Sequence, residues 1–194
     1  MVGAGGAGGN ANTHNPILNG DRGSGGGGGG AATRFSIAVT AGDIFTYAVG
    51  SGGAVSLLFP GQGGIGGSTT LASGAVPGQA RAEGGAGGRV DVFSGGTGGI
   101  VDGASVPGQL AVSGAQGSVG TFSFDGTFYF EMGGNGGASS LGPGGSGGDI
   151  FTLPTAGSFP GGGGGGGAGP GLSITAGAGA DGAIFITVPS SVFP

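Results

Sequence analysis

The acidic residues are the first candidates for chemistry, because paired carboxylates serve in glycoside hydrolysis and in metal binding. None of them has the spacing of a catalytic pair or a metal loop, and most neighbour a glycine, where an acid usually shapes a turn. We therefore expect no catalytic pair and no metal site. The nine acids of the 194-residue chain are Asp21, Asp43, Glu83, Asp91, Asp102, Asp125, Glu131, Asp149 and Asp181.

The remaining chemistry-bearing residues are equally sparse. His14 is the only histidine, and cysteine is absent, so neither a catalytic triad nor a zinc site can be assembled. Glycine-rich matches to nucleotide loops are expected by chance among 60 glycines, and a phosphate-binding loop of the Walker type needs a lysine that the chain lacks. The four arginines are scattered, which argues against nucleic-acid binding. We expect no enzymatic activity and no cofactor.

One aromatic cluster stands out, and an Asp-Gly turn signal at Asp125 and Gly126 predicts that it folds as a β-hairpin. Alternation along a strand predicts that all its phenylalanines share one face and that its tyrosine lies on the other. Two interpretations stay open: a contact for a receptor or a neighbouring subunit, or a small core packed against the rest of the chain. The cluster consists of Phe122, Phe124, Phe128, Tyr129 and Phe130.

Glycine is the most frequent residue, so the fold that positions these side chains must be built largely from glycine. It supplies 60 of 194 residues, while charged residues make up 7% and the mean hydropathy is +0.29. No strict Gly-X-Y register is present, which excludes collagen, and disordered chains are normally more charged. A conventional hydrophobic core cannot hold together so much glycine, so backbone hydrogen bonds must do it.

A five-residue word, Gly-Gly-x-Gly-Gly, recurs six times. Two tracts of pure glycine, Gly25–Gly30 and Gly161–Gly167, accompany it. Flexible linkers are the alternative interpretation, but linkers do not repeat one word between hydrophobic segments. The six words are Gly5–Gly9, Gly63–Gly67, Gly84–Gly88, Gly95–Gly99, Gly133–Gly137 and Gly144–Gly148.

The word has a period of three, which matches the three residues per turn of a polyproline II helix. Such helices make no internal hydrogen bonds, and they can bond laterally only where side chains are missing. The pattern therefore predicts a bundle of polyglycine II helices. Helices with glycine on two edges would lie outside, and the two pure-glycine tracts would lie at the centre.

Strand-like stretches separate the tracts, and no helical periodicity appears. Residues 35–39 and 44–49 flank a turn signal and predict a second hairpin, and Ala183–Val188 predicts a C-terminal strand. Shorter candidates are 56–59 and 90–93, and Val76–Gln79 recurs weakly as Val106–Gln109. The fold class expected is mainly β and irregular, a glycine bundle without significant α-helix. We expect one domain, 1–194, with sub-parts 1–67, 68–132 and 133–194.

The run of Phe35–Val39, Ala41–Phe45 and Val49–Gly53 resembles the glycine-rich domain of bacteriophage tail and tail-fibre proteins. A later Gly-Gly-Ser-Thr segment, Gly66–Thr69, and the closing order of polyglycine tract, small-residue spacer and strand extend that resemblance over most of the chain. The chain also resembles the tip adhesins of T-even-type phages. That resemblance implies a polyglycine II bundle whose variable loops bind the bacterial surface.

The expected function is a non-enzymatic virion protein, most simply a tail-fibre or tail-tip component that attaches to a host receptor. Its loops would be Asn10–Ser24, Ser68–Glu83, Ile100–Met132 and Asp149–Pro160. A capsid decoration protein and a polyglycine II ice-binding protein remain as alternatives. Expected partners are other virion subunits, in a homotrimer as in fibres or as a single copy as in tip adhesins, and a bacterial receptor. We expect no membrane insertion, assembly in the host cytoplasm and a final place in the virion.

Overall fold

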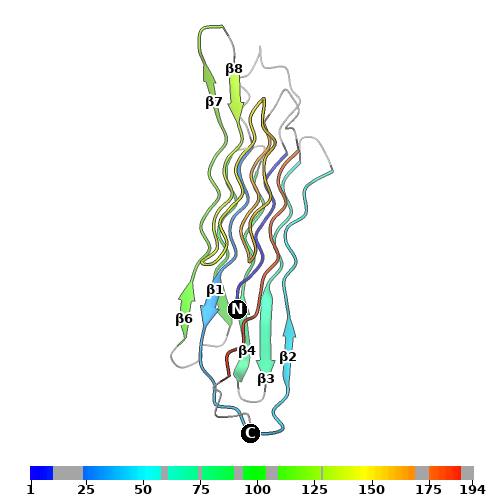
Figure 1. Cartoon of the computed structure of the whole chain (residues 1–194), viewed down its shortest axis with the longest axis vertical. Coiled ribbons are helices and arrows are strands. Elements are labelled where there is room, and N and C mark those ends of the chain that lie inside the picture. The colour runs from blue at the N-terminus through cyan, green and yellow to red at the C-terminus, as the bar shows by residue number, and fades with distance from the viewer. Residues whose placement is uncertain are drawn as a thin grey trace.

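A computed structural model of the chain (Figure 1) describes residues 1–10, 24–57, 61–73, 76–89, 94–103, 109–127, 129–168 and 175–188. Within these ranges it contains short strands and extended segments but no α-helix, as the sequence predicts. Nothing in the described part of the chain is a helix that could span a membrane. The strands are β1 (Ala32–Arg34), β2 (Phe45–Ala48), β3 (Thr69–Ser73), β4 (Val76–Ala82), β5 (Val101–Gly103), β6 (Leu110–Val112), β7 (Thr121–Phe124) and β8 (Tyr129–Met132).

The body of the molecule is a bundle of twelve extended segments that bond to one another mainly through lateral backbone hydrogen bonds. Three of them, residues 2–10, 24–31 and 161–168, are central, and we call them the central segments. Successive segments along the chain run in opposite directions. The nine outer segments are residues 50–54, 61–67, 83–89, 94–100, 114–118, 133–139, 142–148, 155–158 and 177–183.

The hydrogen bonds of residues 2–10 follow the predicted period of three. Residues 2, 5 and 8 donate to segment 177–183, residues 3, 6 and 9 donate to segment 24–31, and residues 4, 7 and 10 donate to segment 61–67. Three edges of one helix thus face three different neighbours, as an extended helix with three residues per turn requires. The predicted polyglycine II geometry is confirmed.

The central segments also bond to one another. Gly6 donates its N–H to the carbonyl oxygen of Gly28 at 2.9 Å, Gly27 donates to Gly164 at 2.8 Å, and Gly164 donates to Gly6 at 2.9 Å. The nine outer segments form a closed ring around this triangle, and the ring closes where Gly182 donates to Gly50 at 2.9 Å. The core of the protein is therefore made of hydrogen-bonded backbone rather than of large apolar side chains.

Close approach of backbones explains why glycine is needed. A Cβ atom at Gly28 would overlap the carbonyl oxygen of Thr97, and one at Gly163 would overlap that of Gly27. In the outer segments the middle residue of the glycine word points away from the bundle, and Thr97, Asn135 and Ser146 are exposed. These residues can therefore vary in type, as the sequence predicted for the third edge.

The prediction for the centre was correct for the two pure-glycine tracts and incomplete for residues 5–9. That segment is central too, although it carries Ala4 and Ala7, and both are fully buried. The two alanines lie three residues apart, on the edge that bonds to segment 61–67. This edge accommodates a methyl group, so a central segment does not need glycine on all three edges.

Because successive segments run in opposite directions, the connections between them lie at the two ends of the bundle (Figure 1). One end, which we call the hairpin end, carries the β7–β8 hairpin and the loop of residues 149–153. The opposite end, which we call the strand end, carries strands β1 to β6 and residues 184–188. The strands arise where the chain leaves the bundle and gains side chains again.

Sheet order at the strand end follows the order of the outer ring. The four-stranded antiparallel sheet runs β2-β3-β4-β5, and these strands extend segments 50–54, 61–67, 83–89 and 94–100, which are neighbours in the ring. Strands β1 and β6 also pair, as extensions of the central segment 24–31 and the outer segment 114–118, which bond to each other in the bundle. Each strand pair therefore continues two segments that already bond to each other in the bundle.

Ring order also corrects two strand predictions. The turn at residues 40–43 forms, with Asp43 donating its N–H to Thr40 at 3.1 Å, but β2 pairs with β3 and residues 35–39 form no strand. The predicted C-terminal strand is wrong as well: Ala183 makes an isolated bridge with Val2, and residues 184–188 are unpaired. Of the shorter candidates, Ser56 and Leu57 are not in a strand, and residues 90–93 and 106–108 lie outside the described residues.

Candidate contact surface at the hairpin end

The β7–β8 hairpin forms as its Asp-Gly signal predicts. Its strands are antiparallel, Gly126 adopts a φ of 98°, and the Asp125 carboxylate accepts the backbone N–H of Thr127 at 2.8 Å. A positive φ at this position suits glycine, which lacks the Cβ that would clash there. In Figure 1 the hairpin projects beyond the bundle at one end. Because β7 follows segment 114–118 and β8 leads into segment 133–139, two neighbouring outer segments fix its base.

The predicted face of the aromatic cluster is wrong. Phe122 stands opposite Glu131 and Phe130 opposite Ser123, so the two phenylalanines lie on opposite faces of the hairpin. The register also pairs Phe124 with Tyr129. The prediction assumed that even-numbered residues stay on one face through the turn. Because an even number of residues separates the two strand ends, the even-numbered residues of β8 lie on the opposite face from those of β7. Phe128 lies outside the described residues.

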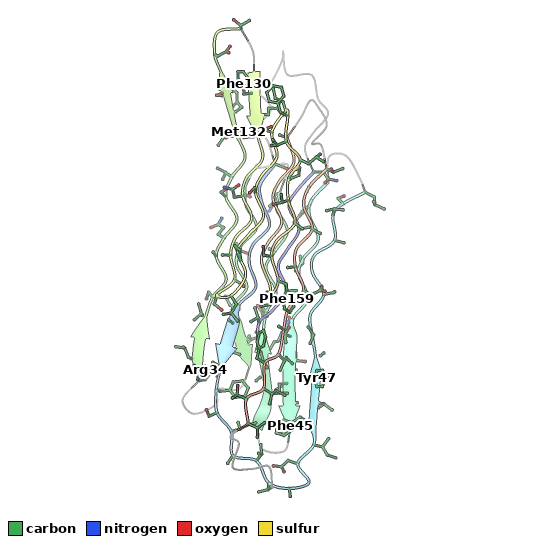
Figure 2. The ribbon with its side chains drawn as sticks, in the orientation of Figure 1. Arg34, Phe45, Tyr47, Phe130, Met132 and Phe159 are labelled. Atoms are coloured by element: carbon green, nitrogen blue, oxygen red, sulfur yellow. The ribbon has the colours of Figure 1, made fainter. Side chains whose placement is uncertain are left out.

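Both faces of the hairpin nevertheless present apolar side chains. Phe122 is 38% exposed, Phe130 is half-buried, and Met132 at the base is 50% exposed. Figure 2 shows Phe130 and Met132 at the hairpin end. Glu131 between them is buried, with 3% of its surface exposed. The hairpin is thus neither a closed satellite core nor a fully solvated loop.

A second loop lies beside the hairpin, and the sequence analysis did not single out its apolar residues. Met132 bridges to Asp149, where segment 142–148 ends and the loop of residues 149–153 begins. Phe151 is 78% exposed and Leu153 is 62% exposed. The available signal was an acid followed by Ile150, Phe151 and Leu153 within a short connection between two glycine segments.

Asp149 holds this loop in shape. Its carboxylate accepts the backbone N–H groups of Phe151 at 2.7 Å and Thr152 at 2.6 Å, and its own N–H donates to Thr152 at 3.0 Å. These hydrogen bonds to the charged form lower the pKa of Asp149 below its usual 3.8, first through Phe151 and then through Thr152. The loop therefore presents Phe151 in a defined conformation at neutral pH.

Together these residues make what we call the hairpin-end surface: Val119, Phe122, Met132, Phe151 and Leu153, all exposed. They belong to consecutive ring positions, because segments 114–118, 133–139, 142–148 and 155–158 bond in that order. No lysine or arginine occurs between residues 90 and 194. The surface is apolar with acids at its margin, which suits contact with an apolar or uncharged partner and not with phosphate.

Two buried polar side chains close the bundle beneath this end. Asn10 donates from Nδ2 to the carbonyl oxygen of Ser56 at 2.7 Å, and its Oδ1 accepts the N–H of Ala176 at 2.9 Å. Ser24 contacts the carbonyl oxygens of Gly9 and Gly167, so its hydroxyl lies where the three central segments meet. These side chains satisfy backbone groups that would otherwise lose their partners where the helices end.

The glycine positions predicted as structural all fall within the bundle, but four of its segments were missed. The missed segments are 50–54, 114–118, 155–158 and 177–183. None of the four contains the word Gly-Gly-x-Gly-Gly, although each makes the same lateral backbone hydrogen bonds as the segments that do. Glycines three residues apart, such as Gly114 and Gly117, were the available signal.

The predicted loops do not gather at one end. Ile100–Met132 contains bundle segment 114–118, and Asp149–Pro160 contains segment 155–158, so neither is a single loop. Ser68–Glu83 forms β3 and β4 at the strand end, where Arg81 and Glu83 make an ion pair at 3.4 Å. Residues 11–23, with His14, lie outside the described residues. Among the described residues no three acids or histidines gather as a metal site would need.

A family model named as a glycine-rich domain matches residues 1–189. The chain belongs to this glycine-rich domain family. No curated protein sequence matches the chain significantly. The match covers every segment of the bundle and both of its ends.

Proposed function

We propose that the chain is a non-enzymatic structural protein of a bacteriophage particle, a tail-fibre or tail-tip component that contacts the host surface through its hairpin end. One observation carries the proposal. A hydrogen-bonded shaft separates two ends, and one of them projects a hairpin and a loop whose apolar residues are exposed. The assignment to a phage particle rests on the sequence resemblance of Phe35–Gly53 and the closing tracts to phage tail domains.

The mechanism is mechanical. Lateral hydrogen bonds run from each bundle segment to its neighbours, so the shaft resists bending and fraying. Residues in the terminal connections make few of these bonds and can change without disturbing the shaft. Such a division suits an attachment protein, because the contact surface can vary between relatives while the support stays constant.

Binding of the purified chain to bacterial cells tests the proposal. The full chain, fluorescently labelled, would be incubated with a panel of bacterial strains and washed. We expect retention on at least one strain. The double variant Phe151→Ser/Leu153→Ser should lose that retention, because it removes the most exposed apolar area of the hairpin-end surface.

A matched variant controls for general loss of apolar surface. Ile65→Ser/Leu141→Ser removes two similarly exposed residues, one on the shaft and one at the strand end, and should bind as the unmodified chain does. Equal loss in both variants, or no retention on any strain, contradicts attachment through the hairpin end. Density of an assembled particle that places the chain on the capsid contradicts the tail assignment.

A further inference from the structure

At the strand end, one segment has the sequence of a β-strand but no strand partner among the described residues. Residues 184–188, Ile-Phe-Ile-Thr-Val, are extended and rich in β-branched and aromatic residues, yet they make no hydrogen bond with any described residue. Ile186 is 72% exposed and Phe185 is 61% exposed. Such a sequence normally forms a strand with a partner.

The same end contains an open strand edge. In the sheet β2-β3-β4-β5, β2 is terminal, and none of the described residues pairs with its outer edge. Thr46, Tyr47 and Ala48 are exposed. Figure 2 shows Phe45 and Tyr47 along this edge. An exposed and uncharged edge strand is a template for pairing with another chain.

Ring order points to what belongs beside β2. Segment 177–183, which precedes residues 184–188, is the ring neighbour of segment 50–54, which follows β2. Within the four-stranded sheet, ring neighbours continue as paired strands. At the β5 edge the next ring segment continues as β6, which pairs with β1, whereas at the β2 edge no strand follows segment 177–183 within the described residues. The sequence of residues 184–188 is of the type that would fill this position.

The chain's own segment does not fill the position. Val2 and Ala183 exchange two hydrogen bonds, at 2.7 Å and 2.9 Å, which draw the chain toward the centre of the bundle. In Figure 1 the red C-terminal stretch accordingly lies apart from β2. Residues 35–39 are also without hydrogen bonds, but Phe35 and Ile37 pack against Ala80 and are thus engaged within the chain.

We infer that two copies of this chain associate by strand addition, with residues 184–188 of one copy pairing with the outer edge of β2 in another. Each copy offers both partners, so the contact is head-to-tail and can link two or more copies. Neither β2 nor residues 184–188 contains a charged residue, so identical copies meet there without repulsion. This inference does not depend on the proposed function.

Disulfide trapping tests the pairing directly, because the chain has no cysteine of its own. Chains carrying only Thr46→Cys would be mixed with chains carrying only Ile186→Cys and then oxidised. We expect a covalent dimer of twice 17.5 kDa on a non-reducing gel. The matched pair Leu57→Cys with Ile186→Cys should give no dimer, because Leu57 lies at the hairpin end. Absence of the dimer in the first mixture overturns the inference.

Two further measurements separate the alternatives. Light scattering of the full chain should give a multiple of 17.5 kDa, and Ile186→Asp should reduce it to a single copy, whereas Leu141→Asp at the same end should not. Thermal unfolding of both variants at high dilution checks that each remains folded. If the chain is a single copy, or if a chain carrying both cysteines links only to itself, intermolecular strand addition is wrong.

Discussion

Gly27 donates its backbone N–H to the carbonyl oxygen of Gly164 at 2.8 Å, and this bond joins two glycine tracts that are far apart in the sequence. The carbonyl oxygen of Gly27 in turn accepts the N–H of Gly137 at 2.8 Å. Both tracts are fully buried, although neither contributes a side chain. Stability therefore depends on many such bonds being made together, and each needs the backbones in close contact.

The first prediction concerns a single methyl group in this contact. Gly163→Ala places a Cβ against the carbonyl group of Gly27, where backbone atoms rather than a flexible side chain would have to move. We expect the free energy of unfolding to fall by about 3 kcal/mol, the upper end of the usual cost of overpacking. Denaturant unfolding measures it. Thr97→Ala, on the exposed edge of an outer segment, should change stability by less than about 0.5 kcal/mol; equal effects would contradict the close-packed centre.

The second prediction concerns the buried amide beneath the hairpin end. Asn10→Ala leaves the carbonyl oxygen of Ser56 and the N–H of Ala176 without their side-chain partner. An unsatisfied buried group costs about 1–3 kcal/mol, and because Ser56 and Ala176 are only partly buried we expect a loss near the lower end of that range. Asn135→Ala is the matched control, since the exposed Asn135 amide accepts one bond from Gly147 at 2.9 Å and water can replace it. A smaller loss for Asn10 than for Asn135 would show that the amide does not close the bundle.

The third prediction uses amide hydrogen exchange to test whether the bundle is ordered as a unit. Amides of the central segments, such as Gly27 and Gly164, should exchange slowest, because they open only when the whole bundle opens. Amides of residues 184–188 should exchange close to the rate of an unstructured peptide in a dilute, single-copy sample, because they have no partner there. Uniformly fast exchange in the glycine tracts would contradict the bundle and indicate that the tracts are flexible linkers.

How much of this fold the sequence predicts depends on where each residue's partner lies. The pure-glycine tracts predicted their own central position, because only the absence of a side chain on every edge explains them. Segments 50–54 and 114–118 escaped notice because their outward halves carry ordinary residues such as Ser51 and Gln116. Local composition identifies the centre of such a bundle more readily than its rim.

Strand pairing was harder to predict, because it depends on contacts distant in the sequence. The turn at Thr40–Asp43 formed, yet β2 paired with β3, since their adjoining bundle segments are ring neighbours. In the hairpin the partners were right, but the face of Phe130 relative to Phe122 was reversed by the length of the turn. Phe151 and Leu153 lie beside the hairpin because segments 133–139 and 142–148 are ring neighbours and Asp149 bridges to Met132, and the local sequence does not indicate these contacts.

The last prediction concerns Asp149 and the pH at which its loop loses its shape. Because hydrogen bonds from Phe151 and Thr152 lower the pKa of the folded carboxyl below 3.8, the folded loop binds a proton less readily than the unfolded chain does. The stabilisation is therefore present above pH 3.8 and is lost as the pH falls through the lower folded pKa. The carboxylate accepts its hydrogen bonds from residues of its own loop, so the effect should be confined to the loop and leave the bundle intact.

An NMR titration of the Asp149 carboxyl carbon, followed together with the amides of Phe151 and Thr152, measures this directly. All three signals should share one midpoint, below 3.8. In Asp149→Asn the two amides should no longer titrate, while the amides of Gly27 and Gly164 should be unchanged in both proteins. A carboxyl midpoint at or above 3.8 would mean that Asp149 does not hold the loop, and Phe151 would then lack the fixed presentation that the hairpin-end surface requires.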